Sequence, residues 1–119
     1  MPVEGVDLAV VDIDGSGLPA VALSDEAPAA GDPLLFIGNP LGFDWTISEA
    51  EMNAVVLLGE VQTLYFSGPV RSGSSGSPVF DQNAEVVGVI FATLRGEEDS
   101  GLAIPISYLN SYLEETDEY

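Results

Sequence analysis

The chain has 119 residues, of which 46% are hydrophobic, so it is long enough for one domain with a core and too short for two. Twenty acidic side chains against two arginines give a net charge of −18, which makes DNA, RNA and anionic membranes poor partners. Cysteine and histidine are both absent, which excludes disulfide bonds and the usual zinc ligands.

Short apolar runs broken by Gly, Pro, Asn and Asp predict an all-β barrel or sandwich. We expect strands over residues 8–13, 20–23, 34–37, 60–66, 78–80, 86–94 and 102–104. Weaker patterns over 45–47 and 54–58 flank a polar stretch at 48–53, which we interpret as a loop. Residues 81–84 predict a hairpin turn, and apolar residues at helical spacing after Ser107 predict a short closing helix over 107–115.

The acidic, lysine-free composition also bears on the environment of the protein. Like charges repel at low ionic strength, and near 1 M salt the Debye length, over which they interact, shortens to about 3 Å. The composition therefore resembles that of proteins from halophilic microbes, with an ordinary acidic protein as the alternative. No signal peptide or bilayer-spanning run is visible, so we expect a soluble chain and leave its compartment open.

Residues 73–78, Gly-Ser-Ser-Gly-Ser-Pro, carry the clearest chemical signal. A serine nucleophile has to stand exposed on a tight turn, with backbone N–H groups directed at the oxygen that becomes negative. Glycines at 73 and 76 allow such a turn around Ser75, so the pattern favours Ser75 as a nucleophile. A glycine- and serine-rich loop without chemistry is the alternative.

This loop, followed by Val-Phe-Asp at 79–81, resembles the nucleophile loop of chymotrypsin-like serine peptidases. Three further segments are similar to the HtrA (Deg) or glutamyl-endopeptidase branches and occur in the family's order: Asp-Leu-Ala-Val at 7–10, Gly-Asn-Pro-Leu-Gly at 38–42, and Gly-Leu-Ala-Ile-Pro-Ile at 101–106. The resemblance implies the C-terminal six-stranded antiparallel barrel of the double-barrel fold. Residues 1–17 would then be a remnant of the first barrel, and 18–119 the second barrel with its helix.

The resemblance also implies a set of site residues. Ser75 would be the nucleophile, Asp7 would orient the catalytic base, and the N–H groups of Gly73 and Ser75 would form the oxyanion hole. Residues 91–93 would pair with substrate backbone as an added strand. The substrate side-chain pocket would be walled by Pro69, Phe91, Ala92, Thr93 and Gly101. Because none of these is charged, we expect a small or medium apolar side chain before the scissile bond, and we expect no cofactor.

The base of this family is a histidine that precedes the aspartate, within the first barrel, and this sequence contains no histidine. An exposed carboxylate such as that of Glu60 is too weak a base for a hydroxyl, so we expect the chain alone to be inactive or nearly so. A fragment of a longer gene, a degenerate remnant, or a first barrel on a separate chain would each explain the missing histidine.

Two classes of function remain open at this stage. One is a serine endopeptidase domain that acts on peptide or protein substrates. The other is a non-catalytic module that binds peptides or proteins, and an apolar flank left without a first barrel would favour a homodimer or another partner. Residues 12–17 faintly resemble a calcium loop, but the twelfth position is Leu23 and not the required glutamate, so we expect no metal site.

Overall fold

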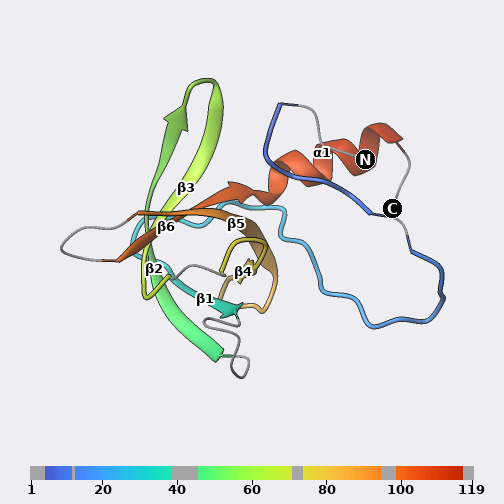
Figure 1. Cartoon of the computed structure of the whole chain (residues 1–119), viewed down its shortest axis with the longest axis horizontal. Coiled ribbons are helices and arrows are strands. Elements are labelled where there is room, and N and C mark those ends of the chain that lie inside the picture. The colour runs from blue at the N-terminus through green and yellow to red at the C-terminus, as the bar shows by residue number, and fades with distance from the viewer. Residues whose placement is uncertain (1–4, 12, 39–45, 71–73, 95–98, 117–119) are drawn as a thin grey trace.

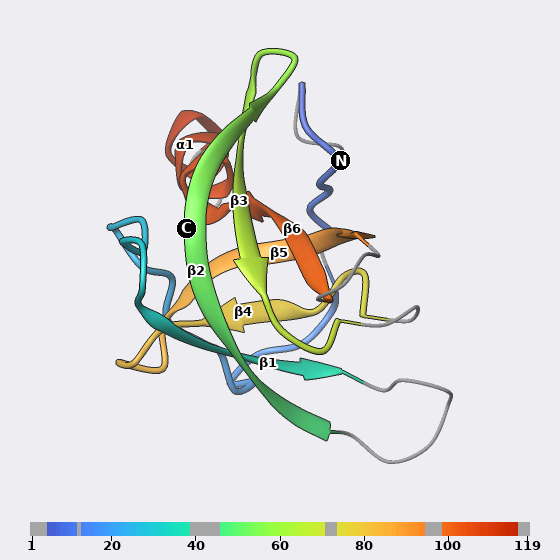
Figure 2. The same ribbon diagram turned by 90° about the vertical axis from the view of Figure 1, so that its left-hand side faces the viewer.

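The computed structural model describes residues 5–11, 13–38, 46–70, 74–94 and 99–116 (Figure 1). The elements follow in the order β1 (Pro33–Gly38), β2 (Thr46–Leu58), β3 (Val61–Ser67), β4 (Pro78–Phe80), β5 (Val86–Leu94), β6 (Ser100–Pro105) and α1 (Ile106–Thr116). The strands close into an antiparallel barrel in the order β1-β2-β3-β6-β5-β4 (Figure 2). The predicted six-stranded barrel with a C-terminal helix is therefore confirmed.

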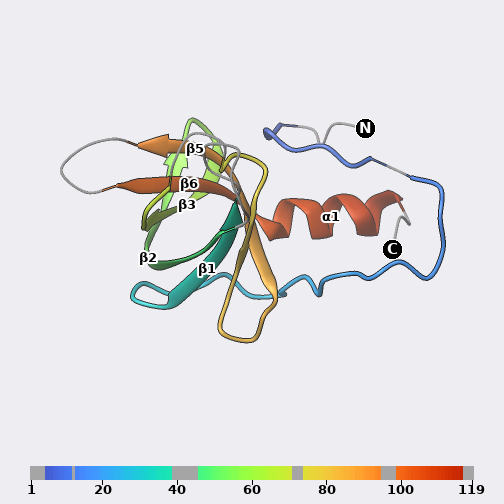
Figure 3. The same ribbon diagram turned by 60° about the horizontal axis from the view of Figure 1, so that its bottom comes forward.

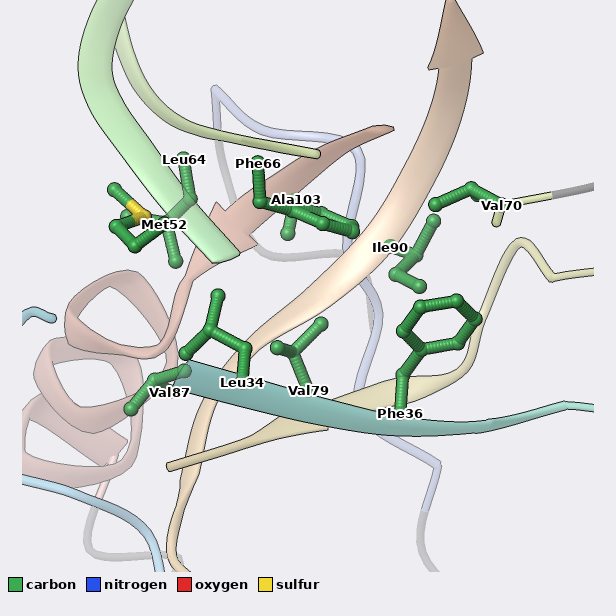
Figure 4. Close-up of a cluster of buried hydrophobic side chains, with 10 residues drawn as sticks. All are labelled: Leu34, Phe36, Met52, Leu64, Phe66, Val70, Val79, Val87, Ile90 and Ala103. Carbon is green, nitrogen blue, oxygen red and sulfur yellow. The ribbon is translucent and has the colours of Figure 1, made fainter. Parts of the chain in front are cut away.

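The barrel is filled by the inward-facing side chains of all six strands. On β1, for example, Leu34 and Phe36 are buried while the residues that alternate with them are exposed, as expected for the period of two in a strand. The rings of Phe36 and Phe66 meet inside the barrel at a centroid distance of 6.1 Å and an angle of 57°. Figure 4 shows this core, which is formed by Leu34, Phe36, Met52, Leu64, Phe66, Val70, Val79, Val87, Ile90 and Ala103.

The interpretation of residues 48–53 as a loop was wrong, because β2 is one strand of 13 residues. Its first half pairs with β1 from Thr46 to Glu51, and its second half pairs with β3. Met52 points into the core, while a register shift beside Asn53 allows its amide to donate a 2.7 Å hydrogen bond to the hydroxyl of Ser67. Glu49 and Glu51 are exposed and alternate with the residues that pair with Leu34 and Phe36. The carboxylates of this stretch therefore mark the outward face of the strand rather than a break in it.

The predicted strands over 8–13 and 20–23 were also wrong. Among the described residues of 5–32, Leu23 makes an isolated bridge to Val86 on β5, but no longer ladder forms. Val86 donates its N–H to Ala22 O and accepts from the N–H of Ser24, each at 2.9 Å. A β-branched run becomes a strand only where a neighbouring strand can pair with it, and this segment instead passes along both sides of α1 (Figure 3).

The helix α1 joins the barrel to this N-terminal segment. Ile106 is buried at its start, and the Tyr108 hydroxyl accepts a 2.9 Å hydrogen bond from the N–H of Gln62 on β3. From the same helix, Asn110 donates its side-chain amide to Ser24 O at 3.0 Å. The predicted helix over 107–115 is therefore confirmed to within a residue at each end. Within the described ranges, no helix has the length and apolar character needed to cross a membrane.

Candidate active site

Ser75 lies in the turn just before β4, and this turn is hydrogen-bonded to β5. The N–H of Gly76 donates to Ile90 O at 2.7 Å, and the N–H of Ile90 donates to Ser77 O at 3.0 Å. Within the turn, the N–H of Ser77 donates to Ser74 O at 3.0 Å. Gly76 has a φ of 90°, which residues with a Cβ rarely adopt, so the sequence requires glycine here. The backbone around Ser75 is therefore fixed by main-chain contacts on both sides.

The side chains of this turn point in opposite directions. Ser74 is buried, with 2% of its surface exposed, whereas Ser75 is exposed. The Ser75 hydroxyl is 3.5 Å from the carbonyl oxygen of Phe91, which is the outer limit of a hydrogen bond. Such a contact holds the hydroxyl weakly, so Ser75 Oγ remains available to an incoming group.

Ser75 and Asp7 line the same cavity, although they come from opposite parts of the chain. This cavity has a volume of about 630 Å³. One wall consists of residues 6–9, and the other consists of Ser75, Gly76 and residues 89–91 of β5. Asp7 is exposed at this wall, and the side chains around it are mostly apolar. The fold thus brings together the hydroxyl and the carboxylate that the sequence singled out, with open space beside them.

The strand that borders the turn has an unpaired edge. On one side, Ala92 and Thr93 of β5 pair with Leu102 and Gly101 of β6. On the other side, the pairing with β4 ends at Val89, and no other described strand continues it along 91–93. A register shift between Ile90 and Ala92 makes Phe91 an extra residue in the ladder. The free edge therefore starts directly beside Ser75, where an extended peptide could pair with it.

A family model described as a trypsin-like peptidase domain matches residues 1–89, which is most of the chain. The chain belongs to the trypsin-like peptidase family. Among curated relatives, it is 35% identical to a probable periplasmic DegP-like serine endoprotease of Pseudomonas putida strain W619, over 84% of this chain and 22% of that protein. It is 30% identical to the putative serine protease HhoB of Synechocystis, over 84% of this chain and 26% of that protein. The chain thus spans about a quarter of the length of these relatives.

Solved structures of similar fold include serine proteases of the same kind. The serine endoprotease from Yersinia pestis is 26% identical, with a TM-score of 0.73 over 87% of this chain and 37% of that chain. An HtrA-type protease solved with a decapeptide has a TM-score of 0.75 over 90% of this chain and 35% of that chain; at 24% identity, it shows the fold alone. The chain is therefore a trypsin-like serine protease domain of HtrA type, in its barrel portion.

The N–H groups of Gly73 and Ser75 are the predicted donors of the oxyanion hole. Gly73 lies outside the described residues, whereas Ser75 lies in the fixed turn. No group of three His, Cys, Asp or Glu side chains in the part of the chain that the structure describes could hold a metal ion.

The structure differs in one respect from the substrate side-chain pocket that the sequence predicts. Gly101 is buried, and a Cβ placed on it would lie 2.7 Å from Phe66 Cζ and 3.0 Å from Val70 Cγ2. The space in front of Gly101 is therefore filled by two apolar side chains. Of the other predicted wall residues, Pro69 is exposed and Phe91, Ala92 and Thr93 are half-buried.

Sequence reasoning missed Phe66 and Val70, the two buried side chains that fill the space in front of Gly101. Phe66 lies directly opposite Gly101 in the pairing of β3 with β6, so its ring covers the glycine across the ladder. Only the register between β3 and β6 shows that Phe66 lies opposite Gly101. A local sequence pattern does not contain this register, because the two strands lie far apart in the chain.

Proposed function

We propose that this chain is the nucleophile-bearing barrel of a serine endopeptidase and that Ser75 is its nucleophile. The observation that carries the proposal is the fixed turn at residues 74–77, which leaves the Ser75 hydroxyl exposed in a cavity shared with Asp7. A turn of this kind is what nucleophilic attack requires, because the hydroxyl must reach the substrate while the backbone stays fixed. Membership of the trypsin-like family supports the same reaction.

In the proposed reaction, Ser75 Oγ forms a bond to the carbonyl carbon of a peptide and gives its proton to a base. The carbonyl oxygen becomes negative and is held by backbone N–H groups, for which Gly73 and Ser75 are the candidates. The C–N bond then breaks as the departing amine takes the proton from the base. Water attacks the resulting ester, releases the acid and restores Ser75.

The base in this scheme must come from outside these residues. The sequence contains no histidine, so the imidazole that Asp7 would orient has to be supplied by residues beyond the 119 or by another molecule. Without it, the oxyanion contacts and substrate binding remain. In related triads, these leave about 10³–10⁴-fold acceleration over water, a small part of the full effect. We therefore propose that the chain alone is nearly inactive towards peptides.

The substrate would be an extended peptide segment that adds to the free edge of β5 over residues 91–93. An HtrA-type structural neighbour of the same fold was solved with a decapeptide, which supports peptide binding by such a barrel. Phe66 and Val70 fill the space in front of Gly101, which supports a preference for small apolar side chains before the scissile bond. Cleavage of a peptide library mainly after charged residues would contradict this preference.

A fluorophosphonate probe tests the nucleophile directly. Incubation of the chain with excess probe, followed by peptide mapping, compares the labelling of Ser75 with that of Ser107, an exposed serine at the start of α1. We expect slow labelling, selective for Ser75 and absent in Ser75→Ala. Equal labelling of the two serines would contradict the nucleophile role. Rapid stoichiometric labelling of Ser75 would instead show that the account of the base is wrong.

A second candidate function is peptide binding without cleavage, and the absence of histidine favours it. Fluorescence polarisation with a labelled apolar decapeptide distinguishes the two functions. A pure binding module would bind the peptide, with no selective labelling of Ser75 under any condition. In the endopeptidase account, Ser75→Ala retains peptide binding and loses all selective labelling.

A further inference from the structure

The strand β1 is apolar on both of its faces, which is unusual for an antiparallel barrel next to water. Leu34 and Phe36 point into the core. The alternate positions, Pro33, Leu35 and Ile37, point outward, and each is exposed. An antiparallel sheet with one wet face normally carries polar residues on that face. The outward face of β1 therefore has the apolar composition of a face that is covered by another surface.

The neighbours of β1 extend this apolar face into a groove. These neighbours are β2 and β4, between which β1 lies in the barrel (Figure 2). Ile37 pairs with Ile47 on β2, which is 68% exposed, and Leu35 pairs with Phe80 on β4. Together with the turn after β4, these residues line a groove of about 550 Å³ with a mainly apolar surface. We call it the β1 groove. Its volume lies within the range of about 300–1,000 Å³ that is typical of ligand pockets.

The β1 groove adjoins a second hollow of opposite character, of about 410 Å³. The two share Asp81 and Gln82, and Glu49 is a further carboxylate on the β1 groove itself. The carboxylates that line the second hollow are Asp25, Glu26, Asp32, Asp81 and Glu85. Asp81 is already tied to the turn, since its Oδ1 accepts from the N–H groups of Asn83 and Glu85 at 2.8 and 3.0 Å. An apolar groove thus adjoins a hollow lined by several carboxylates.

We propose that the β1 groove binds a segment of a different protein, with apolar side chains in the groove and lysine or arginine side chains in the acidic hollow. Charge complementarity selects this partner, because several carboxylates gathered at one end of an apolar groove attract cations and repel acidic segments. A second copy of this chain fits poorly. It carries a net charge of −18 and only two cationic side chains, Arg71 and Arg95.

The β1 groove is separate from the candidate active site, since the cavity beside Ser75 shares none of its lining residues. The proposal therefore does not depend on peptidase activity and adds a second binding surface to the barrel. A partner held in the β1 groove would leave the free edge of β5 accessible.

The test uses a fluorescein-labelled decapeptide that alternates leucine or valine with threonine and ends in two lysines. Binding is followed by fluorescence polarisation at low salt, and ¹H–¹⁵N spectra of the chain locate the site. One comparison peptide has glutamates in place of the lysines, and another has serines in place of the leucines and valines. We expect the basic apolar peptide to bind at least about tenfold more tightly than either.

The variants Leu35→Ser and Ile47→Ser test the groove without disturbing the core, because both side chains are exposed. Each should weaken binding about tenfold, the effect of losing one well-packed aliphatic side chain. Glu49→Lys should weaken binding of the basic peptide and reduce its salt dependence. The matched control is Leu94→Ser, which removes another exposed apolar residue, 44% exposed and outside the β1 groove, and should leave the affinity unchanged.

Three results would overturn the proposal. One is equal binding of the basic and acidic peptides. Another is a map of spectral changes that centres on Ser75 and residues 91–93 instead of β1 and β2. The third is a wild-type dimer that Leu35→Ser or Ile47→Ser converts to a monomer, since the groove would then serve a second copy. Circular dichroism of each variant confirms that the barrel is intact before its affinity is compared.

Discussion

Adding one methyl group at Gly101 tests how the space beside the proposed substrate pocket is filled. In Gly101→Ala, the new Cβ would lie 2.7 Å from Phe66 Cζ and 3.0 Å from Val70 Cγ2, whereas carbon atoms in good contact are about 3.5–4.0 Å apart. Phe66 is 0% exposed and Val70 is 4% exposed, so neither side chain can move aside into solvent. Overpacking of this kind costs about 1–3 kcal/mol, against a gain of about 0.5–1 kcal/mol from replacing a strand glycine.

We therefore expect Gly101→Ala to lower the free energy of unfolding by about 1–2 kcal/mol, or roughly 4–8 °C in Tm. Phe66→Leu removes the ring atoms nearest to Gly101 and alone should cost about 1 kcal/mol. If the ring causes the clash, the double variant should be more stable than the sum of the two losses by about 1 kcal/mol. Urea unfolding followed by circular dichroism at one fixed salt concentration measures all four proteins. Strictly additive losses, or a neutral Gly101→Ala, would refute this packing argument.

Four further predictions concern other parts of the molecule. Tyr108→Phe removes the acceptor of the Gln62 N–H, so the free energy of unfolding should fall by about 0.5–1.5 kcal/mol and amide exchange at Gln62 should become faster. Asp7→Asn should change the free energy of unfolding in urea by less than about 0.5 kcal/mol because Asp7 is exposed, and a large loss of stability would contradict this. The same variant should slow the labelling of Ser75 by a fluorophosphonate when free imidazole is added as the base. Phe66→Leu should free space in front of Gly101 and shift peptide binding towards larger side chains before the scissile bond; an unchanged preference would count against Phe66 as the residue that limits this space. Raising KCl from dilute buffer to about 1 M should increase Tm because it screens the net charge of −18, and full stability in dilute buffer would disagree with the high-salt interpretation.

Much of the barrel could be predicted because its signals are local. The alternation around Leu34 and Phe36 and the turn at residues 81–84 each lie within a few residues of sequence. The middle of β2 could not be predicted in this way, because the carboxylates of Glu49 and Glu51 face outward while the backbone pairs with β1. The N-terminal runs failed for the opposite reason, since their residues favour strands, but in the described part of the chain their pairing does not extend beyond isolated bridges such as that of Leu23 to Val86.

The candidate site shows the same division between local and long-range information. A local glycine and serine pattern was enough to place Ser75 on an exposed turn. That Asp7 shares its cavity followed from the family resemblance, because nothing near either residue encodes their proximity. The filling of the space in front of Gly101 by Phe66 and Val70 was missed, since the position of Phe66 depends on the register between β3 and β6.

The most direct test of the central claim is the rate at which a fluorophosphonate labels Ser75, relative to Ser107, as free imidazole is added. Imidazole can supply the base that the sequence lacks, and the cavity of about 630 Å³ beside Ser75 and Asp7 has room for it. We predict that labelling of Ser75 accelerates and then saturates with imidazole, while Ser107 does not respond beyond the general effect of buffer. An identical response of the two serines would contradict the assignment of Ser75 as a nucleophile.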